Sequence, residues 1–193
     1  MTLLKRGFKS WCENAALNYR RDFNLPKFAR LDPRQLAART GVTIWTPYEI
    51  EGLDPKVLHQ LLEVDSSSWS AVTLTLGGSS AIIINSSHQL GRQNSSLAHE
   101  LSHLILRHEP ARAFVTPDGM MVMNHYNPTH EEEANVLSAT LLVPREGLVH
   151  LQARGYTDSD MATHFAVSLE LLQWRKHATG VARQLAHATN YRR

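Results

Sequence analysis

Two histidines and a glutamate at residues 99–103 have the types and the spacing for metal-dependent hydrolysis. His99 and His103 are four residues apart, so an α-helix would place both imidazoles on one face, where they can hold one metal ion. Glu100 follows His99 directly, and its carboxylate can act there as a general base. Because the chain has 11 histidines in 193 residues, this H-E-x-x-H pattern could also arise by chance, and the rest of the sequence must decide.

A catalytic zinc ion usually takes three protein ligands and keeps one position open, so a third ligand is expected further along the chain. His108 comes five residues after His103 and would point away from the ligand face of a continuous helix. The extended motif that ends in a third histidine also fails, because Glu109 stands at that position. The remaining arrangement takes a glutamate from a second helix, with Glu131 as the preferred ligand and Glu133 as the alternative.

The second helix has its own start signal and a second polar residue on the ligand face. We expect it to begin at Thr129, because Thr129 and Glu132 have the spacing of a capping box. Its later part is almost wholly apolar up to Pro144, which predicts a buried helix. Asn135 lies four residues after Glu131 on the same face, so it could hydrogen-bond one ligand histidine while Glu131 binds the metal.

The segments around the motif predict a mixture of helices and a small sheet. Residues 70–76 and 81–85 are rich in β-branched side chains and flank a Gly-Gly-Ser-Ser turn, which predicts a β-hairpin leading into the metal helix at 94–107. Zinc proteases with this motif commonly add the substrate to a sheet edge, and we expect residues 82–85 to form that edge. Residues 110–128 have little periodicity and predict a loop. Further helices are expected at 4–22, 33–41, 54–62, 144–154, 161–166 and 169–179, and a strand at 42–46.

The composition is that of an ordinary globular protein without a strong charge. Lys and Arg total 20 against 18 Asp and Glu, a formal charge of +2, which argues against broad binding to nucleic-acid phosphates. Cys12 is the only cysteine, so neither an intrachain disulfide nor a thiolate zinc site can form, which fits a reducing compartment. Glu13 and Asn14 interrupt any N-terminal apolar run, and no stretch is long enough to span a membrane, so we expect a cytoplasmic protein without a membrane partner.

Three segments together resemble a known family. The chain has L-A-H-E-L-S-H at 97–103, E-E-E-A-N at 131–135 and L-L-V-P at 141–144. In this order and spacing they resemble the ImmA/IrrE family of metallo-endopeptidases, over roughly residues 82–144. The two coupled motifs are far more specific than the H-E-x-x-H pattern alone.

The resemblance implies a ligand set and a fold. It implies zinc (Zn2+) on His99, His103 and Glu131, with Glu100 as the general base. It also implies an α+β fold with a zincin-like, thermolysin-like core, in which a small antiparallel sheet packs on helices. A C-terminal helical part that resembles a helix-turn-helix follows this core.

The same resemblance suggests the organisation and the partner. We expect an N-terminal helix at 1–30, the metallopeptidase core at 31–144 and a C-terminal helical region at 145–193. Members of the family typically cut one regulatory protein, so the implied partner is a protein substrate such as a DNA-binding repressor.

Two questions stay open at the level of sequence. A further donor to the oxyanion is expected, and His125, Tyr126 and His130 are candidates that no spacing argument separates. The alternative function is a non-catalytic regulator, or a phage or toxin–antitoxin accessory protein, that binds a repressor or DNA through the C-terminal helices. Binding to DNA is possible but not favoured, because the net charge is small.

Overall fold

The computed structural model describes residues 4–76, 78–109, 112–115, 121–124 and 127–181. Along the chain the elements are α1 (Phe8–Asp22), α2 (Pro33–Arg39), β1 (Thr43–Trp45), the 3₁₀ turn η1 (Pro47–Glu49), α3 (Pro55–His59), the π-helical turn η2 (Gln60–Val64), β2 (Ala71–Leu76), β3 (Ser79–Ile84), α4 (Leu90–Leu106), β4 (Arg112–Val115), β5 (Met121–Asn124), α5 (Pro128–Leu142), α6 (Arg145–Gln152), α7 (Asp158–Phe165) and α8 (Leu169–Thr179). The class is therefore α+β, as predicted.

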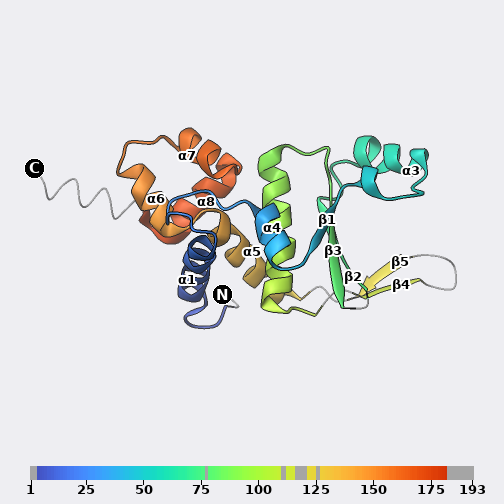
Figure 1. Ribbon diagram of the computed structural model, residues 1–193, viewed down its shortest axis with the longest axis horizontal. Helices are drawn as coiled ribbons and strands as arrows, with labels where there is room; N and C mark the ends of the chain where they lie inside the picture. Colours follow the sequence, from blue (N-terminus) through green and yellow to red (C-terminus); the bar gives the residue numbers. More distant parts are fainter. Residues whose placement is uncertain (1–3, 77, 110–111, 116–120, 125–126, 182–193) are drawn as a thin grey trace, which may run out of the picture.

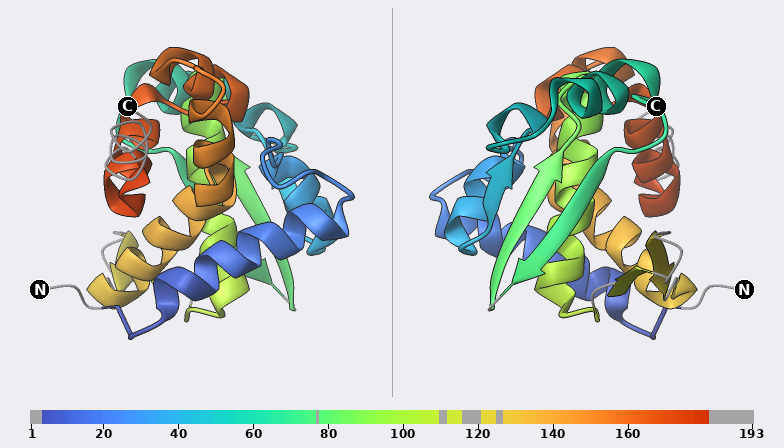
Figure 2. Two further views of the ribbon diagram at one scale, coloured as in Figure 1. Left: turned by 90° about the vertical axis from the view of Figure 1, so that its left-hand side faces the viewer. Right: turned by 90° about the vertical axis from the view of Figure 1, so that its right-hand side faces the viewer.

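Helix α4 lies at the centre of the molecule. The sheet of β1, β2 and β3 covers one side of α4, and α1, α5 and the C-terminal helices cover the other (Figure 1). The side views show the strands crossing the face of α4 (Figure 2). Because α4 is enclosed on both sides, its buried polar residues Asn94 and Ser102 must find hydrogen-bond partners inside the protein.

The predicted hairpin is present, but the sheet is mixed where an antiparallel one was expected. Strands β2 and β3 pair antiparallel, with Val72 opposite Ile83. Strand β1 pairs parallel with β3, with Ile44 opposite Ile82. The difference arises because a long connection containing α3 and η2 separates β1 from the hairpin, and a crossover of that kind permits parallel pairing.

The expectation that residues 82–85 form a receiving edge is wrong. The strand order is β1-β3-β2, so β3 is hydrogen-bonded on both sides. Ile82 and Ile84 are fully buried, as in an ordinary central strand. The sequence could not reveal this, because the short β1 that occupies the other side of β3 lies far away in the chain. Strand β2 is an edge strand of this sheet and, like β3, packs beside α4.

The core consists of two clusters that meet at α4 and α5. One cluster joins the sheet and α1 to Leu97, Leu101 and Leu137. The other joins α6, α7 and α8 to Ala98 and Leu142. Each fully buried leucine contributes about 2 kcal/mol through removal of its apolar surface from water. Helices α4 and α5 therefore each pack against apolar side chains of both clusters.

The first residues of α2 and α3 agree with the sequence prediction, and that of α5 differs from it. Asp32 and Asp54 cap α2 and α3 as expected, each accepting a hydrogen bond from a backbone N–H two residues later. The expected cap at Thr129 is wrong, because Asn127 caps α5 and its side chain accepts from the Thr129 backbone N–H at 3.0 Å. Pro128 at the first helical position has no N–H to leave unpaired, which favours this earlier start.

Two further boundaries differ from the sequence prediction. Helix α4 starts at Leu90, four residues early, and the buried Asn94 donates to the Ala166 carbonyl in the α7–α8 turn at 2.9 Å. Within the stretch predicted as a loop, β4 and β5 pair antiparallel, with Phe114 opposite Val122. Residues 116–120, between these two strands, lie outside the described residues.

Two buried arginines connect α1 and α8 to the end of α5. The Arg20 guanidinium donates to the Leu142 carbonyl at 3.4 Å, and the Arg175 Nε donates to the Val143 carbonyl at 2.9 Å. Arg175 also pairs with Glu13 at 2.6 Å. Carbonyls at the end of a helix lack intrahelical partners, so these bonds satisfy groups that would otherwise be costly to bury.

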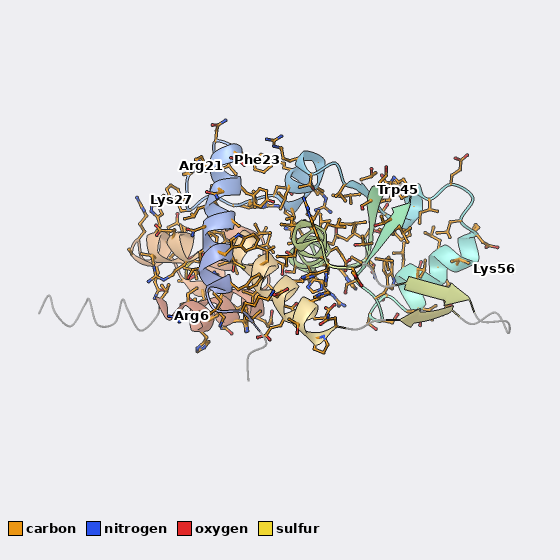
Figure 3. All side chains as sticks on the ribbon, turned by 90° about the horizontal axis from the view of Figure 1, so that it is seen from below. Arg6, Arg21, Phe23, Lys27, Trp45 and Lys56 are labelled. Carbon is orange, nitrogen blue, oxygen red and sulfur yellow. The ribbon has the colours of Figure 1, made fainter. Side chains whose placement is uncertain are left out.

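These contacts matter for the helix-turn-helix-like pair of α7 and α8. Arg175 is the single arginine of α8, and its pairing with Glu13 removes it from phosphate contact. Of the labelled basic side chains, Arg6, Arg21 and Lys27 lie around α1 and Lys56 lies at the other end of the molecule (Figure 3). Within the described part of the chain, no helix combines the length and apolarity needed to cross a membrane.

Replacing Arg175 by leucine should lower the free energy of unfolding by about 3 kcal/mol, because the half-buried Glu13 would lose its charged partner and the Val143 carbonyl would lose its donor. Urea denaturation of wild type and variant measures this change. Lys176→Leu is the control: its pair with Asp158 lies closer to solvent, and we expect a loss of about 1 kcal/mol or less. Equal losses in the two variants would contradict the assigned role of Arg175.

Candidate metal centre

Helices α4 and α5 bring three potential metal ligands together. His99 and His103 project from the same side of α4, with their Nε2 atoms 3.0 Å apart. Glu131 stands in the first turn of α5, with one carboxylate oxygen 3.3 Å from His99 Nε2 and the other 3.5 Å from His103 Nε2. The side chains selected from the sequence as ligands therefore converge on one point between the two helices.

The geometry and the charge state of this triad fit a metal ion. Ligand atoms about 2.0 Å from a tetrahedral metal are about 3.3 Å from each other, and the observed separations bracket that value. Burial, together with the neighbouring His99, His108 and His130, lowers the pKa of His103 to about 4. His103 is thus neutral near pH 7, which is the form that binds metals.

Glu100 lies beside the triad and faces the sheet. Its carboxylate accepts a hydrogen bond from the Thr73 hydroxyl on β2. Burial raises the pKa of Glu100 above its ordinary value, and the bond from Thr73 acts in the opposite direction. Thr73 was missed in the sequence analysis, because no local pattern relates a strand residue to a helix residue 27 positions later.

A cleft of about 430 Å³ opens over these groups. Its walls are β2, α4 and the start of α5, so the triad and Glu100 share one space that a substrate could enter. Lining residues from the sheet and the end of α4 include Ala71, Thr75, Ser80, Leu104 and Glu109.

The hydrogen bond expected from Asn135 is absent. Asn135 is exposed, and in the described structure its side chain bonds neither His99 nor His103. It lines a separate groove of about 410 Å³ on another side of the His99 ring, together with Leu142 and Trp174. Sharing a helix face with Glu131 was therefore not sufficient to bring it to a ligand.

His108 contacts His103, one of the candidate ligands, contrary to the sequence expectation. The helix ends at Leu106, and Arg107 takes a left-handed conformation with φ 55°. The backbone N–H of His108 then donates to the His103 carbonyl at 3.0 Å, which turns the chain back over the last turn. His108 Nδ1 lies 2.9 Å from His103 Nδ1. The expectation assumed a continuous helix, and the left-handed residue invalidates it.

The remaining candidates have different surroundings. Glu133, the alternative ligand, lies 3.1 Å from His108 Nε2 and is not part of the triad. His130 lines the cleft and stacks on His108 with ring centroids 4.1 Å apart. His125 and Tyr126, the other proposed oxyanion donors, lie outside the described residues.

A comparison with family models decides the classification. The model of the IrrE N-terminal-like domain (Peptidase_M78) matches residues 58–176, more than half of the chain. The chain belongs to this family. The match agrees with the resemblance inferred from the motifs, and it spans β2, β3, α4, α5 and most of α8. Membership of this IrrE-like peptidase family supports metallopeptidase chemistry at the triad. No curated protein matches the chain.

The triad predicts that the protein binds one equivalent of a divalent metal and that His99→Ala loses it. The substitution removes one of three ligands, so metal retained after dialysis should fall to background when measured by mass spectrometry. His59→Ala is the matched control, because His59 is exposed on α3 and pairs only with Glu63 in the described structure. Equal metal content in His99→Ala and wild type would refute the ligand assignment.

Proposed function

We propose that this IrrE-like protein is a zinc-dependent endopeptidase that cleaves a specific regulatory protein in the cytoplasm. The observation that carries the proposal is the placement of Glu100 beside the His99–His103–Glu131 triad within one cleft. Two imidazoles and one carboxylate are a ligand set typical of catalytic zinc, with one position left for substrate or water. The peptidase family supports the reaction class.

The chain's own residues would handle the protons of the reaction. When bound by the triad, zinc supplies Lewis-acid chemistry, which acidifies water and polarises a peptide carbonyl. Glu100 takes the proton from the attacking water and later delivers it to the leaving amine. Its raised pKa suits both steps, since a base that must also act as an acid works best with a pKa closer to neutrality. The Thr73 hydroxyl holds this carboxylate in place.

Strand β2 is the part of the cleft that can pair with a peptide substrate. It is an edge strand of its sheet, and Ala71, Thr73 and Thr75 line the cleft. We infer that an extended peptide adds along β2 with its scissile bond opposite Glu100. Strand addition requires an extended backbone, so the substrate segment in this proposal is a flexible one, such as the linker between two domains.

A protein substrate fits the molecule better than DNA does. The formal charge of +2 gives little attraction for phosphates, and Arg175 of α8 is engaged with Glu13. We propose a DNA-binding repressor as the substrate, by analogy with the activity typical of the family. The single buried cysteine supports a reducing cytoplasm as the location.

Glu100→Gln should abolish cleavage while the metal stays bound. The amide keeps the shape of the side chain but cannot accept a proton, so the rate of cleavage should fall roughly 100-fold or more. The assay incubates the zinc-loaded protein with candidate DNA-binding repressors and follows the fragments by mass spectrometry.

Glu109→Gln is the matched control for this experiment. Glu109 is an exposed carboxylate in the same cleft, and its change should leave the rate within a few-fold of wild type. Equal cleavage by wild type and Glu100→Gln would show that Glu100 is not the base. A repressor response that persists in Glu100→Gln without cleavage would favour the non-catalytic alternative.

A further inference from the structure

We propose that His108 and Glu133 form a hydrogen-bonded chain with His103 and fix it in the tautomer that a metal requires. The proposal deepens the proposed function, since it rests on His103 being a metal ligand. His108 and Glu133 are positioning residues, because they act on the metal through His103.

The chain of contacts is continuous from the triad to a carboxylate. His103 Nδ1 lies 2.9 Å from His108 Nδ1, and His108 Nε2 lies 3.1 Å from a Glu133 carboxylate oxygen. Both distances are those of hydrogen bonds. The opposite nitrogen of His103 is the Nε2 that faces His99 and Glu131.

One assignment of protons satisfies every contact for neutral imidazoles. Glu133 accepts only, so His108 must carry its proton on Nε2. His108 Nδ1 then has a lone pair, and the neighbouring His103 Nδ1 must supply the proton between them. The His103 Nε2 is consequently left with its lone pair directed at the metal position. The reverse assignment would place a lone pair of His108 against a carboxylate and a proton where the metal should bind.

The surroundings shield these hydrogen bonds from water. The side chain of His108 is 5% exposed and that of Glu133 is 14% exposed, so water competes little for their hydrogen bonds. The parallel ring of His130 covers one face of His108, with an interplanar angle of 3°. The left-handed Arg107 supplies the backbone turn that brings His108 to this position.

The two ligand histidines differ in this respect. In the described part of the chain, no side chain bonds the Nδ1 of His99, whereas the Nδ1 of His103 has a partner backed by a carboxylate. Such partners orient a ligand imidazole and raise its basicity, and their loss typically weakens metal binding by about 10–100-fold. His103 is therefore the better anchored ligand, through residues that do not touch the metal.

The test compares His108→Leu with His108→Asn, two side chains of similar size. Asparagine keeps an oxygen where His108 Nδ1 accepts, and leucine does not. The zinc dissociation constant, measured by competition with a chromophoric chelator, should rise about 10-fold or more in His108→Leu and by less in His108→Asn. Glu133→Gln should give an intermediate rise. Glu132→Gln, which changes a carboxylate beside the separate groove, should leave it unchanged.

A second measurement keeps the proposal testable even where a variant fails to fold. Long-range ¹H–¹⁵N spectra of wild type should show His103 protonated on Nδ1 and His108 protonated on Nε2. A proton on His108 Nδ1, or equal zinc affinity in folded His108→Leu and wild type, would overturn the proposal. Both readouts need no substrate, so they are independent of cleavage: a wild type that binds zinc without hydrolysis refutes the proposed function alone.

Discussion

The packing of α4 against α5 is the contact on which the rest of the molecule depends. Leu97 and Leu101 meet Leu137 and Leu141 in the first core cluster, and the same two helices supply Ala98 and Leu142 to the second. The distance between the helix axes decides whether Glu131 reaches the two histidines. Because a site tolerates errors of only about 0.5 Å, the apolar contacts on either side of α4 are what makes the polar triad possible.

Three carboxylates meet three different environments within this small volume. Glu100 turns to the hydroxyl of Thr73, Glu131 faces the imidazoles of His99 and His103, and Glu133 accepts from His108. Negative groups gathered in a partly buried place repel one another unless a positive charge compensates them. A divalent cation at the triad would provide that charge, so the electrostatics and the ligand geometry favour the same occupant.

The sequence predicted what local pattern controls and missed what tertiary contacts decide. The histidine pair, the hairpin and the caps at Asp32 and Asp54 follow from spacing and propensity, and the structure confirms each of these elements and caps. The central place of β3 depends on β1, far away in the chain. The position of His108 was predicted wrongly because Arg107 takes a left-handed conformation and reverses the chain after Leu106. An arginine in the sequence does not predict that conformation.

The left-handed turn at Arg107 has a consequence for how sequences of this family can diverge. It couples a histidine five positions after His103 to a glutamate two positions after Glu131, although 25 residues separate them. Losing either one alone would leave a buried polar group without its partner, whereas an apolar pair at both positions would cost little folding stability, at the expense of the Nδ1 partner of His103. The two positions should therefore change together among relatives, so that co-variation, rather than invariance, would mark this support of the metal centre.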